Sequence, residues 1–536
     1  MNSLTRSSDS ELFQIPKRTE YKFKEVNMDD PRAWSLYQTG DTKGLFQVES
    51  QLGKQWCKII KPSNIDELSA LLSLIRPGGL EAGMAEKFAK IKHGQMEPEY
   101  IHPALIPILE KTYSCLVFQE QILEICVKIA GFNEVEADLA RRAVGKKLPE
   151  EMMKVEKMFL EGCKKTGIVS EDIAKAIFAW IQKSVRYLFN AGHSYSYAYI
   201  SYFQAYQKRF FPVEFYTASL NYSSEKIDPK IEIYELIQDA RLRNIKVIPP
   251  DVQRKNADFE IVDNSTIAFG LGHIRGVGFK AIETIQGIKS LNTFNDFLRY
   301  SRKIKRNVAE SLIKSGACDC YKLSRTYMLR VLQSIYGHIV RDDEELPNHL
   351  KKLTDKELKP FLDNIQLFGP IKALQCIIND KGCVSKRIPI IEQKIKFLEN
   401  AQTEDTNRQK SIWEKLYLGL NITCSTADDF EKIDENVKSC RQAYFLQNKE
   451  KATVHCVIDN LYMKKTGEKS KNPGQPYCIL DISDNSGVLQ SVFMWPELYE
   501  IYKDDLSTDV VACISIKKNV WNGRESFAVE KITILG

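Results

Sequence analysis

The stretch ADLARRAVGKKLPEEM (residues 137–152) joins two predicted helices and concentrates positive charge at their junction. Gly145 is expected to close the first helix, and Pro149 is favourable in the first turn of the second. Four cations lie within seven residues: Arg141, Arg142, Lys146 and Lys147. Such a cluster could surround a triphosphate or a nucleic-acid backbone. The alternative is a solvated cationic helix end, which the helix dipole favours.

The sequence on both sides of this junction has the periodicity of amphipathic helices. Asn133 followed by Glu136 has the spacing of a capping pair that would open the first helix. Residues 119–130 and 149–163 each place apolar residues on one helical face. These positions are Ile122, Leu123, Ile125, Cys126 and Ile129 in the first segment and Met152, Val155, Phe159 and Cys163 in the second. We therefore expect a mainly helical domain here.

An aromatic block follows, YLFNAGHSYSYAYISYFQAY (residues 187–206). Its five tyrosines from 195 to 206 can stack on bases, and Asn190 or His193 can donate to phosphate or sugar. The alternative is a buried helix whose tyrosine hydroxyls find partners locally.

The segment FGLGHIRGVGFKAIETI (residues 269–285) has the pattern of a helix–hairpin–helix motif. Gly276 and Gly278 would let backbone N–H groups approach a DNA phosphate at a helix N-terminus. Arg275 and Lys280 supply positive charge beside them. Residues 303–319 could form a second such unit, and the pair strengthens the DNA-binding interpretation while a simple turn stays open.

The C-terminal part changes to β-strands from about Lys451. Five β-rich runs (residues 452–463, 477–482, 487–495, 510–516 and 525–535) predict a small barrel of the OB type. Asn522 and Gly523 predict a tight hairpin before the last run.

Between these regions lies a charged helical connector with the phrase DNIQLFGP (residues 363–370). Leu367 and Phe368 form an apolar pair in polar surroundings. Such a pair could dock into a hydrophobic pocket of a partner protein, or it could be a local core anchor.

Composition narrows the class of protein. The chain has 536 residues with 43% hydrophobic and 27% charged, which fits a folded protein of several domains. The net charge of +6 permits a polyanionic partner without requiring one. No run of 18 apolar residues and no signal-peptide core occurs, and 13 scattered cysteines fit reduced thiols, so a cytoplasmic protein without membrane contact is expected.

Signatures of several catalytic classes are absent from the sequence. It has no P-loop, no G-x-S-x-G phrase and no dinucleotide-binding fingerprint. Cys318-x-Cys320 has no second pair at zinc spacing. We expect no metal site on this chain.

Taken together and in order, these blocks resemble the alpha subunit of bacterial DNA polymerase III, a C-family replicative polymerase. The resemblance runs from about Asp29 over nearly the whole chain. The matching phrases are GDTKGLFQVES (40–50), ALLSLIRPGGLEAGM (70–84), KHG (92–94), TYSCLVFQEQILEI (112–125), RRAVGKKLPEEM (141–152), FNAGHSYSYAYISYFQAY (189–206), VIPPDV (247–252) and FGLGHIRGVGFKAIE (269–283).

The resemblance implies a role for each block. In the family, the arginine pair at Arg141 and Arg142 holds the triphosphate of the incoming nucleotide (dNTP). The tyrosine at Tyr187 packs near the nascent base pair, and Asn190 and His193 lie in the same motif. The tandem helix–hairpin–helix segment binds duplex DNA, and the terminal barrel handles single-stranded template.

Two positions depart from the family pattern. The phrase Phe-Asn-Lys/Arg-Ser-His has Ala191 and Gly192 in its middle, which removes a basic side chain that could contact phosphate or template. The motif that binds the sliding clamp, Gln-x-Ser/Asp-Leu-Phe, corresponds here to Asn364, Gln366, Leu367 and Phe368. Asn364 replaces glutamine, which implies weaker clamp binding.

A larger departure concerns catalysis. The family's palm carries three aspartates that hold two Mg²⁺ ions, and nucleotidyl transfer needs these ions. The Asp-x-Leu-Gly-Leu phrase that marks the last aspartate is absent from residues 1–28. We therefore expect no catalytic residue on this chain. The Mg²⁺ ligands are expected on a separate palm-containing chain, which a split gene would supply and which would cover a large apolar interface around residues 1–60.

The sequence thus predicts a multidomain, mainly α protein with a C-terminal five-stranded barrel of the OB type. The predicted parts are a lead-in (1–30), fingers (31–216), tandem helix–hairpin–helix (217–345), a connector with the clamp motif (346–445) and the OB-fold domain (446–536). The expected partners are primer-template DNA, dNTP, the palm-containing half and a sliding clamp. A catalytically inactive DNA- and clamp-binding accessory protein, or a decayed copy, stays open as the alternative.

Overall fold

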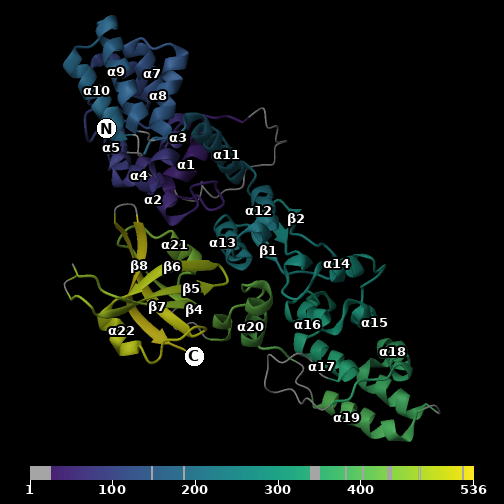
Figure 1. The fold of residues 1–536 in the computed structure, drawn as a ribbon. Coiled ribbons are helices and arrows are strands. Elements are labelled where there is room, and N and C mark those ends of the chain that lie inside the picture. Colours follow the sequence, from purple (N-terminus) through teal and green to yellow (C-terminus); the bar gives the residue numbers. More distant parts are fainter. Residues whose placement is uncertain are drawn as a thin grey trace. The chain divides into compact units, whose positions relative to one another are not determined.

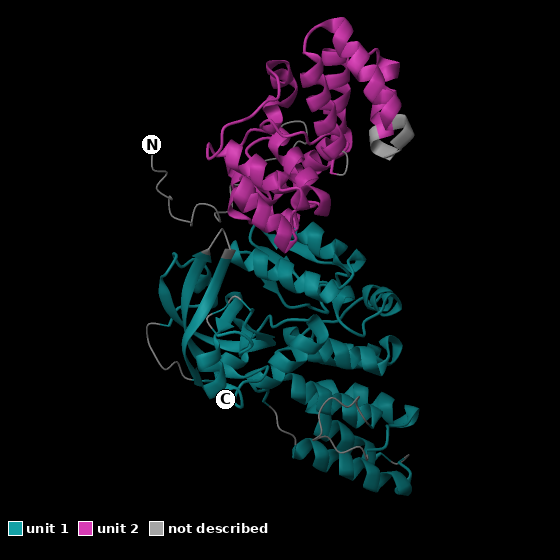
Figure 2. Cartoon of the chain, turned by 60° about the vertical axis from the view of Figure 1, so that its left-hand side comes forward, with its two compact units in different colours: residues 1–14, 216–520, 525–536 teal, residues 15–215, 521–524 magenta. Residues whose placement is uncertain are grey.

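The computed structural model describes residues 26–146, 149–184, 187–337, 350–380, 383–400, 404–430, 437–468, 470, 472–521 and 524–535. The chain divides into two compact units (Figure 2). Unit 2 comprises residues 15–215 and 521–524, and unit 1 comprises residues 1–14, 216–520 and 525–536. The finer domain boundaries given above stay predictions.

Unit 2 is helical. Its helices in chain order are α1 (Pro31–Thr39), α2 (Gln51–Ile60), α3 (Ile65–Leu74), α4 (Pro77–Glu81), α5 (Met84–Lys92), α6 (Ile106–Leu109), α7 (Gln119–Ala130), α8 (Glu134–Lys146), α9 (Pro149–Thr166), α10 (Glu171–Ser184) and α11 (Ala191–Phe210), after which α12 (Pro212–Asn221) leads into unit 1. Figure 1 shows α7, α8, α9 and α10 gathered into one bundle.

The core of this bundle comes from the faces that the periodicity predicts. Ile122, Ile125, Cys126 and Ile129 of α7 are buried with Val155, Phe159 and Cys163 of α9, while Leu123 and Met152 pack at the edge. The predicted cap is also confirmed, because Asn133 Oδ1 accepts from the N–H of Val135 and Glu136 at 3.0 Å and Glu136 Oε2 accepts from the Asn133 N–H at 3.0 Å. Two local signals, periodicity and capping, therefore place these helices.

The prediction of a large apolar interface around residues 1–60 is wrong for residues 26–60, the part of this range that the structure describes. Trp34 and Tyr37 of α1 are buried, and the Trp34 ring lies 4.6 Å from the ring of Tyr202 on α11. Among residues 26–60, the one large hydrophobic side chain that is well exposed is Leu52, at 44%. The reason is that α1 packs its apolar face against α11 within the same unit.

Unit 1 begins with α13 (Pro229–Leu242) and a three-stranded sheet. Its strands are β1 (Lys246–Ile248), β2 (Glu260–Asp263) and β3 (Thr266–Ala268), with β3 central, parallel to β1 and antiparallel to β2. The helices that follow are α14 (Phe279–Gln286), α15 (Phe294–Ile304), α16 (Arg306–Lys314), α17 (Arg325–Tyr336), α18 (Asp355–Asn379), α19 (Ile388–Glu399), α20 (Asn407–Leu418) and α21 (Cys440–Tyr444).

The C-terminal strands close into a barrel. They are β4 (Lys451–Lys465), β5 (Pro476–Asp484), β6 (Gly487–Met494), β7 (Val511–Trp521) and β8 (Arg524–Ile534), with α22 (Pro496–Tyr502) between β6 and β7. The order is β4-β5-β6-β8-β7, and β7 pairs with β4. The β6–β8 pair is parallel and the other assigned pairs are antiparallel, as in an OB-fold. The predicted fold class is confirmed; the predicted hairpin residues Asn522 and Gly523 lie outside the described residues.

A buried ion pair in unit 2 joins α3 to the elements around it. The Glu67 carboxylate, 6% exposed, pairs with the Lys92 ammonium of α5. It also accepts hydrogen bonds from the Tyr113 hydroxyl and the Ser63 N–H, both at 2.7 Å. Burial raises the pKa of Glu67, but the hydrogen bonds from Lys92 and Tyr113 outweigh it, so this pKa lies below its ordinary value.

We expect Glu67→Gln to lower the free energy of unfolding by about 3 kcal/mol at neutral pH, because it leaves a buried ammonium without its counter-ion. Since the folded-state pKa of Glu67 is depressed, its contribution is present above the ordinary glutamate pKa and disappears as pH falls through the folded value. Urea unfolding at neutral and acidic pH measures both effects. Glu124→Gln, which breaks the half-exposed pair with Lys128, is the control and should cost under about 0.5 kcal/mol. Equal losses for the two variants would contradict the argument.

Candidate nucleic-acid interface

Arg141 and Arg142 lie near the end of α8 and share one carboxylate. Asp138 Oδ1 accepts from Arg141 Nη2 at 2.8 Å, and Asp138 Oδ2 pairs with Arg142 Nη2 at 2.7 Å. The hydrogen bond from Arg141 and the charge of Arg142 lower the pKa of Asp138, so the carboxylate stays ionised. The Arg142 side chain is 64% exposed and that of Arg141 is 35% exposed. Two guanidinium groups against one carboxylate leave a net positive charge open to solvent.

The predicted turn at Gly145 is displaced. Helix α8 runs through Gly145 and ends at Lys146. A glycine inside a helix costs only about 1 kcal/mol relative to alanine, so Gly145 does not by itself end α8. Lys147 lies outside the described residues.

Asn190 is the N-cap of α11 and ties this helix to α7. Its Oδ1 accepts from the His193 N–H at 2.8 Å, and its Nδ2 donates to Glu120 Oε1 at 2.7 Å. The second oxygen of Glu120 accepts from the Ala191 N–H at 2.8 Å. Both polar groups of the Asn190 side chain are therefore engaged within the fold, which favours a positioning role over direct contact with a ligand.

His193 belongs to a cluster of rings and one cation on the surface of unit 2. Its ring centroid lies 3.9 Å from that of Tyr197 and 5.5 Å from that of Phe189. The guanidinium of Arg76 lies 3.6 Å above the Phe189 ring. His193 and Arg76 are exposed, and the rings are partly buried. A cation stacked on rings is a surface on which a base or a phosphate can bind.

The sequence did not predict Arg76, Phe189 and Tyr197 as members of this cluster. Phe189 and Tyr197 lie inside the aromatic block, so the aromatic content of that block was the signal available for finding them. Arg76 lies far away in the chain, at the N-cap of α4.

The other tyrosines of the block divide between the two interpretations. Tyr202 is buried, and its hydroxyl donates to the Asn27 carbonyl at 2.7 Å. The Tyr195 hydroxyl donates to Asp66 Oδ1 at 2.5 Å. The alternative of locally satisfied hydroxyls therefore holds for these two. Tyr187 lies at the edge of the α7–α10 core and donates to Ser184 Oγ at 2.8 Å.

Helix packing relates the arginine pair to this cluster. Helices α7 and α8 are joined by three residues and pack side by side, which is the arrangement of an antiparallel pair (Figure 1). The last turn of α8 therefore lies toward the first turn of α7, where Glu120 holds Asn190. The fold thus brings the cations of α8 and the start of α11 to the same end of α7.

In unit 1 the hairpin of residues 275–280 is exposed except at Val277, which is buried. Gly276 has φ of +87°, a conformation that favours glycine, and Gly278 is the N-cap of α14. A Cβ added to Gly278 would meet no atom within 4 Å, so the start of the helix is open. Arg275 and Lys280 are exposed beside it. The element before the hairpin is a single 3₁₀ turn (Leu271–His273) where an α-helix was expected.

The second proposed hairpin differs in geometry. Helices α15 and α16 are joined at a single residue, Lys305, with φ of +74°. No Gly-x-Gly turn is present at this junction, so its backbone offers a different surface from that at Gly278.

The apolar pair of the connector is exposed. Leu367 is 74% and Phe368 is 51% exposed. Ile365, at 5%, takes the place in the core, and this rules out the alternative that the pair is a local anchor. Gln366 is exposed, whereas Asn364 Nδ2 donates to the Pro360 carbonyl at 2.9 Å. Gly369, with φ of 76° and ψ of 172°, breaks α18 directly after the pair.

The barrel carries an aromatic surface that the sequence analysis did not single out. The rings of Tyr477, Phe493 and Trp495 lie 5.4–6.3 Å apart, and Trp495 is 48% exposed. Tyr477 is paired with Lys464 of β4 in the sheet register, which places a cation beside the rings. Stacked rings next to a lysine on the β4–β5–β6 face suit single-stranded nucleic acid.

The described residues offer no place for the metal ions that the resemblance implies. Within the described ranges, no group of three or more His, Cys, Asp or Glu side chains is arranged to hold a metal ion. This part of the chain therefore does not fit a two-metal site. A membrane-spanning helix is likewise not found among the described helices.

Comparison with known proteins identifies related sequences over most of the chain. A model of the bacterial DNA polymerase III alpha subunit finger domain matches residues 10–167, and a helix-hairpin-helix model matches residues 244–328. DNA polymerase III subunit alpha of Aquifex aeolicus is 31% identical over 511 residues, which cover 94% of this chain and 39% of that protein. The Helicobacter pylori protein of the same name is 29% identical, with 95% and 41% covered. The one from Pseudomonas aeruginosa is 37% identical over 305 residues, with 55% and 26% covered.

The first of these relatives are thus matched over about two fifths of their length by nearly all of this chain. The family models match the finger domain and the helix–hairpin–helix motif, and the alignments with these two relatives cover 94% and 95% of the chain. Over this shared part, the chain belongs to the bacterial DNA polymerase III alpha subunit family.

Proposed function

We propose that this chain is the part of a replicative DNA polymerase that holds the incoming dNTP and the primer-template DNA, and that a separate palm-containing chain completes the enzyme. The observation that carries the proposal is the similarity over 94% of the chain to a DNA polymerase III subunit alpha. We expect the enzyme to work in the cytoplasm of a bacterial cell or of a phage-infected one, which the bacterial relatives support.

We assign nucleotide binding to unit 2. Arg141 and Arg142 present fork-shaped donors that match the oxygens of a triphosphate, and Asp138 holds them in place until the ligand arrives. Lys146 and Lys147 would add charge at the same helix end. The cluster of His193, its neighbouring rings and Arg76 offers a surface for the base or the template strand. Asn190 holds the backbone of His193, and Tyr187 is expected beside the nascent base pair.

We assign DNA binding to unit 1. At the hairpin, the open N-terminus of α14 and the exposed side chains of Arg275 and Lys280 suit one phosphate of a duplex backbone. The aromatic face of the barrel suits unpaired template bases. The exposed Leu367–Phe368 pair, with Gln366 and Asn364 before it, suits a hydrophobic pocket on a sliding clamp.

The chemistry of nucleotidyl transfer requires Mg²⁺, which activates the primer hydroxyl and neutralises the leaving pyrophosphate. Because the described residues do not fit such a site, we assign no catalytic step to them. Their contribution is to bind and orient the triphosphate and the DNA, which lowers the barrier through positioning.

The proposal is tested by primer extension with this chain alone and with a palm-containing N-terminal half of a relative. We expect extension only from the pair. Extension by the isolated chain would overturn the need for a partner. Failure of the pair despite tight DNA binding would favour the accessory-protein alternative.

In the complemented enzyme, Arg141→Ala with Arg142→Ala should raise the KM for dNTP at least about tenfold, because a hydrogen bond to a charged group contributes about 1.5–3 kcal/mol. Duplex affinity should stay within about twofold, since these residues lie on unit 2. Lys175→Ala, which removes an exposed cation of α10, is the control and should leave KM unchanged. Loss of duplex binding with unchanged KM would assign the arginines to the DNA backbone.

Gly278→Val should weaken duplex binding roughly tenfold, because the branched side chain would occupy the approach of a phosphate to the start of α14. The fold should tolerate the change, since Gly278 has φ of −90° and the new Cβ meets no atom within 4 Å. Fluorescence anisotropy with labelled duplex and a thermal melt measure the two effects. Gly287→Ala, at the other end of the same helix, is the control. Unchanged duplex affinity in Gly278→Val would remove the hairpin from the interface.

Leu367→Ala with Phe368→Ala should abolish binding to an immobilised sliding clamp and leave the melting temperature unchanged, because both side chains are exposed. Val384→Ala removes another exposed apolar side chain and is the control, with clamp binding retained. Equal clamp binding by all three proteins would show that this pair is not the docking site.

A further inference from the structure

Helix α20 and the turn after it contact both proposed DNA-binding elements of unit 1. We call residues 404–430 the adaptor. The segment was expected to be part of a charged helical connector, and several of its side chains are buried, among them Ser411, Trp413 and Glu414. Its contacts divide into one set toward the helix–hairpin–helix region and one set toward the barrel.

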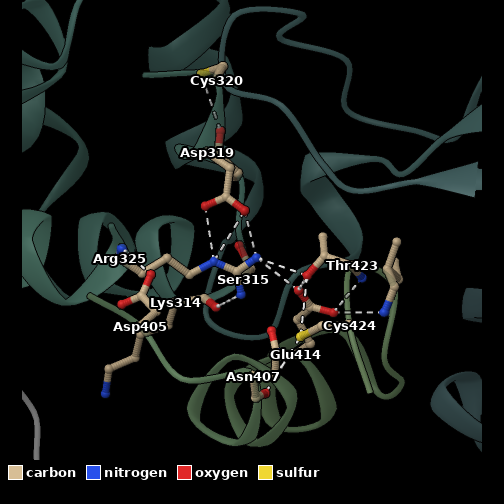
Figure 3. Close-up of polar contacts among 12 residues, drawn as sticks. Lys314, Ser315, Asp319, Cys320, Arg325, Asp405, Asn407, Glu414, Thr423 and Cys424 are labelled. Carbon is tan, nitrogen blue, oxygen red and sulfur yellow. Dashed lines mark hydrogen bonds and ion pairs between the residues drawn. The ribbon is translucent and has the colours of Figure 1, made fainter. Parts of the chain in front are cut away.

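The first set centres on a buried guanidinium (Figure 3). Arg325, at the start of α17, is 1% exposed and donates from Nη2 to Glu414 Oε1 of the adaptor at 2.8 Å and to Asp319 Oδ2 at 2.7 Å. The second oxygen of Glu414 accepts from the N–H groups of Ile422 and Thr423 at 2.7 and 2.9 Å. Glu414 thereby joins α20 and the turn after it to the start of α17.

The adaptor also supports the hairpin itself. The carbonyl of Tyr417, in the last turn of α20, accepts a hydrogen bond from the Arg275 N–H at 2.9 Å. This bond lies directly before Gly276, where the backbone turns with φ of +87°. Helix α20 packs against α16 as well. The position of the duplex-binding turn therefore depends on where α20 lies.

The second set reaches the barrel. Lys415 Nζ lies 3.1 Å from Asp459 Oδ1 on β4 and 2.5 Å from Asp509 Oδ1 before β7. Ala427 packs with the buried Val457 and Val511. Asn485 Nδ2 donates to Asp428 Oδ2 at 2.6 Å. An ion-pair group, an apolar contact and a hydrogen bond thus hold the barrel to the same segment.

We infer that the adaptor sets the spacing between the hairpin and the barrel, so that a primer-template junction binds as one bivalent ligand. This inference rests on the proposed function, in which the hairpin holds the duplex and the barrel holds the unpaired template. When two sites are held at a fixed spacing, binding at the first raises the effective concentration at the second, and a freely moving connector would lose much of this gain. Lys415 is the positioning residue on the barrel side.

The experiment measures the affinity of the full chain for three labelled probes: a blunt duplex, an oligothymidine single strand, and the same duplex with a single-stranded 5′ overhang. Lys415→Met should weaken binding of the overhang probe roughly tenfold and leave the duplex and the single strand within about twofold. A role in general stability would not separate the probes in this way. Lys415→Arg, which keeps the ion pairs, should restore junction binding.

Two further variants complete the experiment, one as a control and one as a second disruption of the Lys415 ion pairs. Lys396→Met removes an exposed cation from α19 and should leave all three affinities unchanged. Asp509→Asn, at a 57% exposed position that the fold tolerates, should weaken the overhang probe in part even if Lys415→Met does not fold. A junction affinity unchanged in Lys415→Met, or in Asp509→Asn where only that variant folds, would overturn the inference. So would equal weakening of all three probes. If the unaltered chain binds neither the duplex nor the single strand, the proposed function fails first, and the inference fails with it.

Discussion

The buried guanidinium of Arg325 is the interaction on which the architecture of unit 1 depends. Each of its three nitrogens donates: Nε to Asp319, Nη1 to the Lys314 carbonyl, and Nη2 to Asp319 and Glu414. Burial would lower the pKa of Arg325, but Asp319 and Glu414 outweigh it and hold that pKa above its usual value. A lysine could not replace this side chain, because one ammonium cannot reach three separated acceptors in a plane.

The network is stable because no member is left unpaired. Removing one partner of a buried ion pair costs about 3–5 kcal/mol, since the other charge stays buried without compensation. The backbone has adapted to it: Gly316 has φ of +85°, and a Cβ there would lie 2.4 Å from Arg325 Nη2. Through this one side chain, the end of α16, the start of α17 and the middle of α20 are held together. The hairpin of residues 275–280 and the barrel are both held to α20.

Unit 2 follows a different principle, in which an apolar bundle carries polar groups at its ends. The bundle core needs no buried charge among its described members, and the cations lie at the end of α8. Asp138 keeps the two arginines together without neutralising them, and Glu120 joins the start of α11 to the start of α7. A rigid core of this kind orients the groups at its end with little entropic cost at the moment of binding.

The sequence alone determined what depends on neighbours along the chain. Helix faces, the Asn133–Glu136 cap and the five barrel strands could be predicted because hydrophobic periodicity, capping spacing and β-rich composition are signals carried by residues close together in the chain. For Leu367 and Phe368 the sequence left a docking pair and a local core anchor open, and the structure decided that both side chains are exposed. Only the tertiary structure decided which residues distant in the chain meet. Arg325 and Glu414 are 89 residues apart, and no periodicity or motif links them. The same holds for Arg76 above Phe189, and for Lys415 between Asp459 and Asp509. Such pairs form because packing brings elements distant in the chain together, and where both charges are buried, as in Arg325 and Glu414, desolvation makes each partner indispensable to the other.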